Sequence, residues 1–138
     1  MIDKINIRVY AIYLNEKNEL MALDERYAGE KLIKLPGGGL EFGEGTIECL
    51  HREFAEELNL KIEVLEHFYT QEDFLVSRFR ENEQLLTIYY TVNILNLEEL
   101  KIIDESIEKV KWISLHEENP LPLPIDKIVF KKLKEKLL

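Results

Sequence analysis

Residues Gly38 to Leu60 read GGLEFGEGTIECLHREFAEELNL, and this stretch decides the fold of the chain. Five of the chain's six glycines lie between residues 37 and 45. Glycine permits positive φ angles and lets a ligand approach the backbone closely, so this part predicts a glycine-rich loop. The second part has the apolar spacing of an amphipathic helix. It predicts a helix over residues 46–58, with Thr46 as its N-cap and Glu48 in its first turn.

The predicted helix separates acidic from apolar residues. At about 100° per residue, Glu53, Glu56 and Glu57 share a sector roughly 100° wide. The adjacent sector is apolar and holds Ile47, Leu50, Phe54 and Leu58. One side of the helix can therefore pack on a core while the neighbouring side carries carboxylates.

The three carboxylates form a candidate metal site. Residues three and four apart are neighbours on a helix, so these side chains repel one another, and a divalent cation would relieve the repulsion. Oxygen ligands without Cys or His suit Mg²⁺ or Mn²⁺ rather than Zn²⁺. An acidic helix face alone is usually solvated surface. The glycine loop lies at a fixed offset from the acids, and Arg52 is placed to reach both Glu56 and Glu44. These two features favour the metal site.

The spacing of these residues resembles the Nudix box, the signature of the Nudix hydrolases, G-x5-E-x7-R-E-U-x-E-E-x-G-U, where U is a bulky apolar residue. The matching positions are Gly38, Glu44, Arg52, Glu53, Phe54, Glu56, Glu57 and Leu60. Asn59 stands where the family has its second glycine. Asparagine is the next best residue for a left-handed helix C-cap, and the change touches no carboxylate.

The resemblance implies a reaction and a set of roles. Nudix hydrolases cleave a diphosphate bond in a nucleoside diphosphate linked to another group X, with Mg²⁺ or Mn²⁺ as cofactor. Metal ligands are then expected at Glu53, Glu56, Glu57 and the carbonyl of Gly38, with Glu53 and Glu57 as the catalytic residues. Glu44 and Arg52 would support the loop. Glu53 is the first choice as general base, and the alternatives from a later segment are Glu98, Glu99, Glu105 and Glu108.

Length and composition set further bounds. A chain of 138 residues predicts a single domain over residues 1–138 with a sizeable core. The net charge of −9 disfavours nucleic acid polymers and anionic membranes as partners. It permits a nucleotide-type diphosphate substrate, because bound metal ions can reverse the sign of a local site. Without a transmembrane-length apolar run, a cytoplasmic location is expected. The family resemblance makes a homodimer an open possibility.

The single cysteine and the histidines add little chemistry. Cys49 has no partner for an intramolecular disulfide, which suits a reducing compartment, and its helical position places it on the acidic side. The three histidines show no metal-ligand spacing and are expected to be structural. They are His51, His67 and His116.

The remaining elements follow from periodicity and turn residues. The predicted strands are Ile5–Leu14, Leu20–Asp24, Leu32–Leu35, Lys61–Tyr69, Leu85–Leu95 and Val110–Leu115. Residues 27–31 and 96–108 are expected to be loops, and residues 71–83 a loop or an extended hairpin. A terminal helix is predicted over Ile125–Leu138, after three prolines that interrupt regular structure. This order predicts an α/β fold, a Nudix-like α/β/α sandwich with a mixed β-sheet between helices.

The residues that would choose X lie outside the box and give a weaker signal. Four basic residues are candidates for substrate binding, namely Arg26, Lys34, Arg78 and Arg80. Aromatic neighbours at Tyr27, Phe74 and Phe79 would suit base stacking or a phosphate contact. Packing or an exposed charge is the commoner role for such residues. Nucleoside triphosphates, ADP-ribose and nucleotide sugars are equally compatible with the sequence.

Two readings without catalysis compete with the hydrolase. One is a catalytically silent Nudix-like nucleotide-binding sensor, which would usually carry a degraded box or an added DNA-binding module. The other is a protein interaction module that uses its acidic face, which would not need glycines and acids in register. A third reading, diphosphate isomerisation, needs additional Cys and His residues that the sequence does not place.

Overall fold

The computed structural model describes residues 1–138 and contains seven strands, two α-helices and one 3-10 helix. The elements in chain order are β1 (Lys4–Ile12), β2 (Glu19–Tyr27), β3 (Glu30–Lys34), β4 (Gly37–Gly39), α1 (Thr46–Leu58), β5 (Ile62–Thr70), β6 (Glu83–Ile94), the 3-10 helix η1 (Leu97–Glu99), β7 (Ile107–Ser114) and α2 (Pro124–Leu137). Neither α-helix has the length and apolar character needed to cross a membrane.

The strands form two sheets. The first has the order β4-β1-β6-β5, in which β1 and β6 are parallel and the other pairs are antiparallel. The second has the antiparallel order β3-β2-β7. The predicted hairpin between β1 and β2 is paired only near its turn, where Met21 N donates to Tyr13 O. The two strands then diverge, so that β1 lies in the first sheet and β2 in the second. The expected mixed sheet is therefore present, but the seven strands are divided between two sheets.

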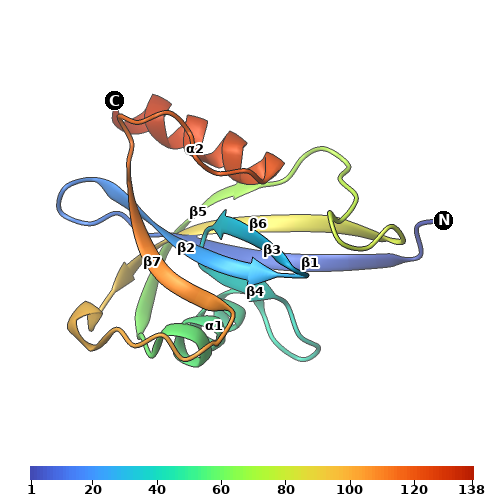
Figure 1. Ribbon diagram of the computed structural model, residues 1–138, viewed down its shortest axis with the longest axis horizontal. Helices are drawn as coiled ribbons and strands as arrows, with labels where there is room; N and C mark the ends of the chain where they lie inside the picture. The colour runs from blue at the N-terminus through green and yellow to red at the C-terminus, as the bar shows by residue number, and fades with distance from the viewer.

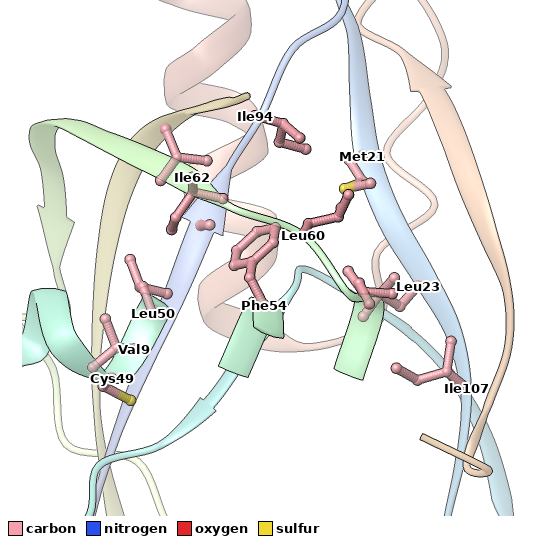
Figure 2. Close-up of a cluster of buried hydrophobic side chains, with 13 residues drawn as sticks. Val9, Met21, Leu23, Cys49, Leu50, Phe54, Leu60, Ile62, Ile94 and Ile107 are labelled. Atoms are coloured by element: carbon pink, nitrogen blue, oxygen red, sulfur yellow. The ribbon is translucent and has the colours of Figure 1, made fainter. Parts of the chain in front are cut away.

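The two helices lie on opposite sides of the strands (Figure 1). Alternation along β1 serves both sides, because successive side chains of a strand point to opposite faces. Val9 and Ala11 join the buried cluster that includes α1, whereas Tyr10 and Ile12 join the cluster that includes α2. In the α1 cluster, Phe54 lies among side chains from both sheets (Figure 2). The layers therefore form the expected α/β/α sandwich.

Helix α1 has the predicted bounds but not the predicted cap. The N-cap is Gly45, whose N–H donates to Glu48 Oε1 at 3.0 Å. Thr46 as N-cap was therefore wrong, because its hydroxyl hydrogen-bonds with Tyr90 Oη at 2.7 Å and ties the helix to β6. At the other end, Asn59 adopts φ 58° and ψ 35°, the left-handed conformation expected for it.

The predicted loop over residues 27–31 was too long. Strand β2 continues to Tyr27 and β3 begins at Glu30, so only Ala28 and Gly29 form the turn. Both have positive φ angles, 51° and 80°, as a tight two-residue hairpin turn requires. The glycines at 37–39 also differ from expectation, because they form strand β4 instead of loop.

A buried acid fastens α2 to the sheet. Asp126, at the start of α2, is 2% exposed and accepts a hydrogen bond from Tyr89 Oη at 2.6 Å. Burial raises the pKa of Asp126 to about 6, although the hydrogen bond from Tyr89 and the charge of Lys34 act in the opposite direction. The folded protein therefore binds this proton more tightly than the unfolded chain does.

This shift predicts the pH dependence of stability. A carboxyl group with a raised folded pKa stabilises the fold below its unfolded pKa, and that contribution is lost as the pH rises through the folded pKa. The shift from 3.8 to about 6 corresponds to about 3 kcal/mol. Between pH 4 and pH 7.5, urea unfolding should show wild type losing about that much stability relative to Asp126→Asn, in which asparagine still accepts from Tyr89. A difference between the two proteins that stays constant across this range would contradict the assignment.

Candidate functional site

The glycine strand lies directly against the acidic face of α1. A Cβ atom at Gly38 would lie 2.5 Å from Oε1 of Glu53, closer than side-chain atoms approach one another. Pairing of Gly38 with Val9 of β1 holds the strand in this position. The Glu53 carboxylate therefore rests on bare backbone, and a side chain at position 38 would displace it.

Arg52 ties the loop, the strand and the helix together. Its guanidinium donates to both carboxylate oxygens of Glu44, at 2.7 and 3.0 Å, and to the carbonyl of Gly39 at 2.9 Å. A further nitrogen contacts Glu53 Oε1 at 2.9 Å. The hydrogen bonds from Arg52 lower the pKa of Glu44 to about 2, so Glu44 is ionised at neutral pH. The contact between Arg52 and Glu44 that the sequence predicted is present.

The three predicted metal-binding carboxylates have different environments. Glu57 is 7% exposed, and burial followed by contact with Glu53 raises its pKa to about 9. The side chain of Glu56 is 60% exposed and lies 3.3 Å from Arg52. The acids are thus brought to one end of the helix face, but no three of them converge on one point.

The donor set fits a hard divalent cation. Glu53 and Glu57 supply oxygen atoms, and the raised pKa of Glu57 reflects its burial and the neighbouring Glu53, which outweigh the opposing charge of Lys34. Glu56 can join them when its exposed side chain turns away from Arg52. The fourth predicted ligand is the carbonyl of Gly38, which lies 3.9 Å from Cys49 Sγ. These are the residues that would hold Mg²⁺ or Mn²⁺.

Cys49 lies in the core and not on the acidic face as predicted. It belongs to the buried cluster under α1, and its thiol contacts the carbonyls of Gly38 and Gly39. Burial, and then the charge of Glu44, raises the pKa of the thiol to about 12. Cys49 is therefore a packing residue.

Three of the four predicted substrate-binding residues are either paired with carboxylates outside α1 or exposed to solvent. Arg26 pairs with Glu108 at 2.5 Å, and Arg78 pairs with Glu30 at 3.0 Å. Arg80 is exposed. The Arg78 pair and the packing of Phe79 on Tyr27, with ring centroids 4.6 Å apart, join the loop at 71–82 to the β2–β3 turn. Phe74 is 66% exposed.

Lys34 is the predicted residue that the structure brings to the site. Its side chain is 11% exposed, and Nζ lies 3.2 Å from Oε2 of the buried Glu25. That oxygen has no donor in hydrogen-bonding geometry, so the pair is held by charge. Burial acts to lower the pKa of Lys34, but Tyr10, Glu25 and Glu57 outweigh it and keep the pKa above its ordinary value.

The alternative general bases are all exposed. Glu108 is occupied by Arg26 and Lys31, and Glu99 accepts from Asn96. The segment that carries them nevertheless closes over the end of α1, because Ile103 N donates to the carbonyl of Glu57 at 2.8 Å. The remaining two are Glu98 and Glu105.

Sequence reasoning missed Arg8. Its Nε donates to Tyr10 Oη at 2.5 Å, and Nη1 would lie 3.5 Å from a Cβ atom at Gly39. The local signal was weak, because Arg8 occupies a polar position in the regular alternation of β1. A surface groove of about 380 Å³ is lined by residues such as Leu65, Phe68 and Leu133 and by none of the carboxylates on α1. The candidate site is therefore identified by its charged side chains and their contacts, and not by the depth of a pocket.

The buried pair predicts a coupled effect on stability. Lys34→Met leaves Glu25 buried without a partner and should lower the free energy of unfolding by about 3 kcal/mol or more. The double variant Glu25→Met with Lys34→Met removes both charges and should recover most of that loss, measured by urea unfolding at pH 7.5. Equal stability of the single and double variants would mean that the pair is not coupled.

Known proteins resemble this chain in family and in fold. The family model described as the NUDIX domain matches residues 4–133. The MutT protein from Methanosarcina mazei Go1 is 20% identical, with a TM-score of 0.80 over 99% of this chain and 97% of that chain. The ORF135 protein of E. coli is 19% identical, with a TM-score of 0.76 over 96% and 90%. A UDP-X diphosphatase is 16% identical, with a TM-score of 0.70 over 99% and 66%.

At these identities the solved structures show a shared fold, which confirms the predicted Nudix-like α/β/α sandwich. The family model covers nearly the whole sequence and includes every residue of the glycine loop and the acidic helix. The chain therefore belongs to the NUDIX family.

Proposed function

We propose that this protein is a metal-dependent hydrolase that cleaves the diphosphate linkage of a nucleoside diphosphate bound to a group X. The observation that carries the proposal is the pair of acids on α1. Glu53 rests on Gly38, and the buried Glu57 contacts Glu53. A packed interior does not retain such a pair for stability, because burial of a carboxylate costs free energy.

The chain's own residues have distinct tasks in this reaction. When bound, Mg²⁺ or Mn²⁺ would neutralise the diphosphate and lower the pKa of the attacking water. Glu53 is proposed to accept the proton of that water, since its carboxylate is fixed by Arg52 and by the glycine strand. Glu56, Glu57 and the Gly38 carbonyl are proposed to share the metal with it. Glu44 acts through Arg52 and is a positioning residue.

The proposed substrate is a small nucleotide in the cytoplasm and not a nucleic acid polymer. With a net charge of −9, the protein would repel a polyphosphate backbone that makes many contacts outside the metal site. The relative named UDP-X diphosphatase shares the fold and supports a diphosphate linkage as the target class. Nucleoside triphosphates, ADP-ribose and nucleotide sugars form the first substrate panel.

Turnover should require both acids. Glu57→Gln and Glu53→Gln are each expected to lower kcat by at least about 100-fold, because each removes a ligand or base that acts on the reacting groups. Products of the panel are followed by chromatography with Mg²⁺ and with Mn²⁺, and Glu135→Gln on α2 is the matched control. Near-wild-type rates in both variants, with the control also active, would sink the assignment.

Metal binding should be visible without turnover. Millimolar Mn²⁺ or Mg²⁺ should raise the Tm of the wild type, because a ligand that binds only the folded state stabilises it. Glu57→Gln should lose that increase while its Tm in EDTA stays at or above the wild-type value, since a buried ionisable group has been removed. Differential scanning calorimetry measures both Tm values. An equal increase in Tm with metal in both proteins would exclude Glu57 as a ligand.

A further inference from the structure

Arg8 is a half-buried cation without an anionic partner. Its Nε is used by Tyr10 Oη, and neither terminal nitrogen makes a hydrogen bond or an ion pair within the chain. The chain has 27 acidic and 18 basic residues, so carboxylates are plentiful. Arginine is seldom buried without a partner, because desolvation of an unpaired charge is costly.

The position of Arg8 relates it directly to the acidic helix. Gly38 lies against Glu53, and the next residue, Gly39, lies against Arg8 Nη1. Successive residues of a strand face opposite sides, so Glu53 and Arg8 lie on the two faces of β4. Strand β4 is the edge of its sheet, with β1 as its only neighbour. A ligand that starts at Glu53 can therefore pass this edge and reach Arg8.

Nearby groups favour the positive charge of Arg8 without forming an ion pair with it. Burial acts to lower the pKa of Arg8, but Tyr10 and the charge of Glu53 outweigh it and raise the pKa above its ordinary value. Lys34 is a second nearby cation, and its own partner is Glu25. When Glu53 binds a metal ion, no carboxylate within ion-pair distance compensates the positive charge of Arg8.

We propose that Arg8 is a specificity-determining residue whose two free Nη groups bind an anionic group on X, in the simplest case a further phosphate. This inference rests on the proposed function and names the class of X that the site prefers. A planar guanidinium matches two oxygens of a phosphate or carboxylate, and Tyr10 fixes its orientation through Nε. A neutral sugar would leave the cation uncompensated, so substrates with an anionic X gain more from this contact.

Matched substrates test the inference. ATP and ADP-ribose, or UTP and UDP-glucose, share a nucleoside diphosphate and differ in whether X is charged. Arg8→Met should lower kcat/KM for the triphosphates roughly 10- to 100-fold, the range of a charge-assisted contact, and change the neutral-X substrates by less than about threefold. Arg8→Lys should recover part of the loss. Lys4→Met removes an exposed cation from the same strand and should behave as wild type.

A binding measurement separates this inference from the proposed function. Calorimetric titration with inorganic tripolyphosphate and with pyrophosphate, in the presence of Mg²⁺, requires no turnover. Arg8→Met should weaken tripolyphosphate binding roughly 10- to 100-fold and leave pyrophosphate binding nearly unchanged. A wild type without turnover on any substrate would count against the hydrolase, while the two titrations still decide the role of Arg8.

Two outcomes would overturn the inference. An equal loss for charged and neutral X, or for both inorganic ligands, would make Arg8 a contact of the scissile diphosphate or a support of the fold. Unchanged values in Arg8→Met for the triphosphates and for tripolyphosphate would show that its guanidinium binds no anion of the substrate. Urea unfolding of Arg8→Met, compared with Lys4→Met, identifies a loss of activity or binding that results from misfolding.

Discussion

The candidate site depends on the contacts that the guanidinium of Arg52 makes. It joins three pieces of backbone that would otherwise be independent, namely the loop through Glu44, strand β4 through the Gly39 carbonyl, and the helix through Glu53. A planar group with five donors can satisfy these acceptors at once, whereas lysine presents one compact charge. With the loop fixed in this way, the glycines at 37–39 lie flat against α1, and Glu53 has a defined position.

The same region concentrates charges that a stable core would avoid. Glu57 and Glu25 are each less than a tenth exposed, and Lys34 interacts by charge with both of them and with Arg8. A buried ion pair contributes little net stability compared with apolar packing, since desolvation offsets attraction. The free energy needed to hold these groups must come from the apolar clusters on either side of the strands. The buried charges are thus confined to one region, and the two buried clusters remain apolar.

Much of the fold was predictable because the signals were local. The bounds of α1 followed from apolar periodicity, and the role of Asn59 followed from the left-handed conformation that a helix end requires. The division into two sheets was not predictable, because it depends on where β1 and β2 diverge rather than on the pattern of either strand. The loop between β2 and β3 was predicted too long because Ala28 is an unusual residue for a positive φ angle.

The site was predictable to the extent that it lies in one continuous segment. Arg52 and Glu44 are close in sequence, and their contact was expected as a link between the loop and the helix. Arg8 and Lys34 come from strands, and only the pairing of β1 with β4 and the burial of β3 bring them near the acids. Long-range contacts of this kind leave little trace in local periodicity.

Strand β4 would allow one acidic protein to hold both metal ions and an anionic ligand, as proposed above. Three glycines give it no side chains, so one face receives Glu53 and the other receives Arg8. The two charges are separated by a single layer of backbone, which prevents them from collapsing into an ion pair. Because Glu53 and Arg8 are not joined by a hydrogen bond, each stays available for a different part of one ligand. A side chain at Gly38 would displace Glu53, so the separation depends on the absence of side chains as much as on the charges themselves.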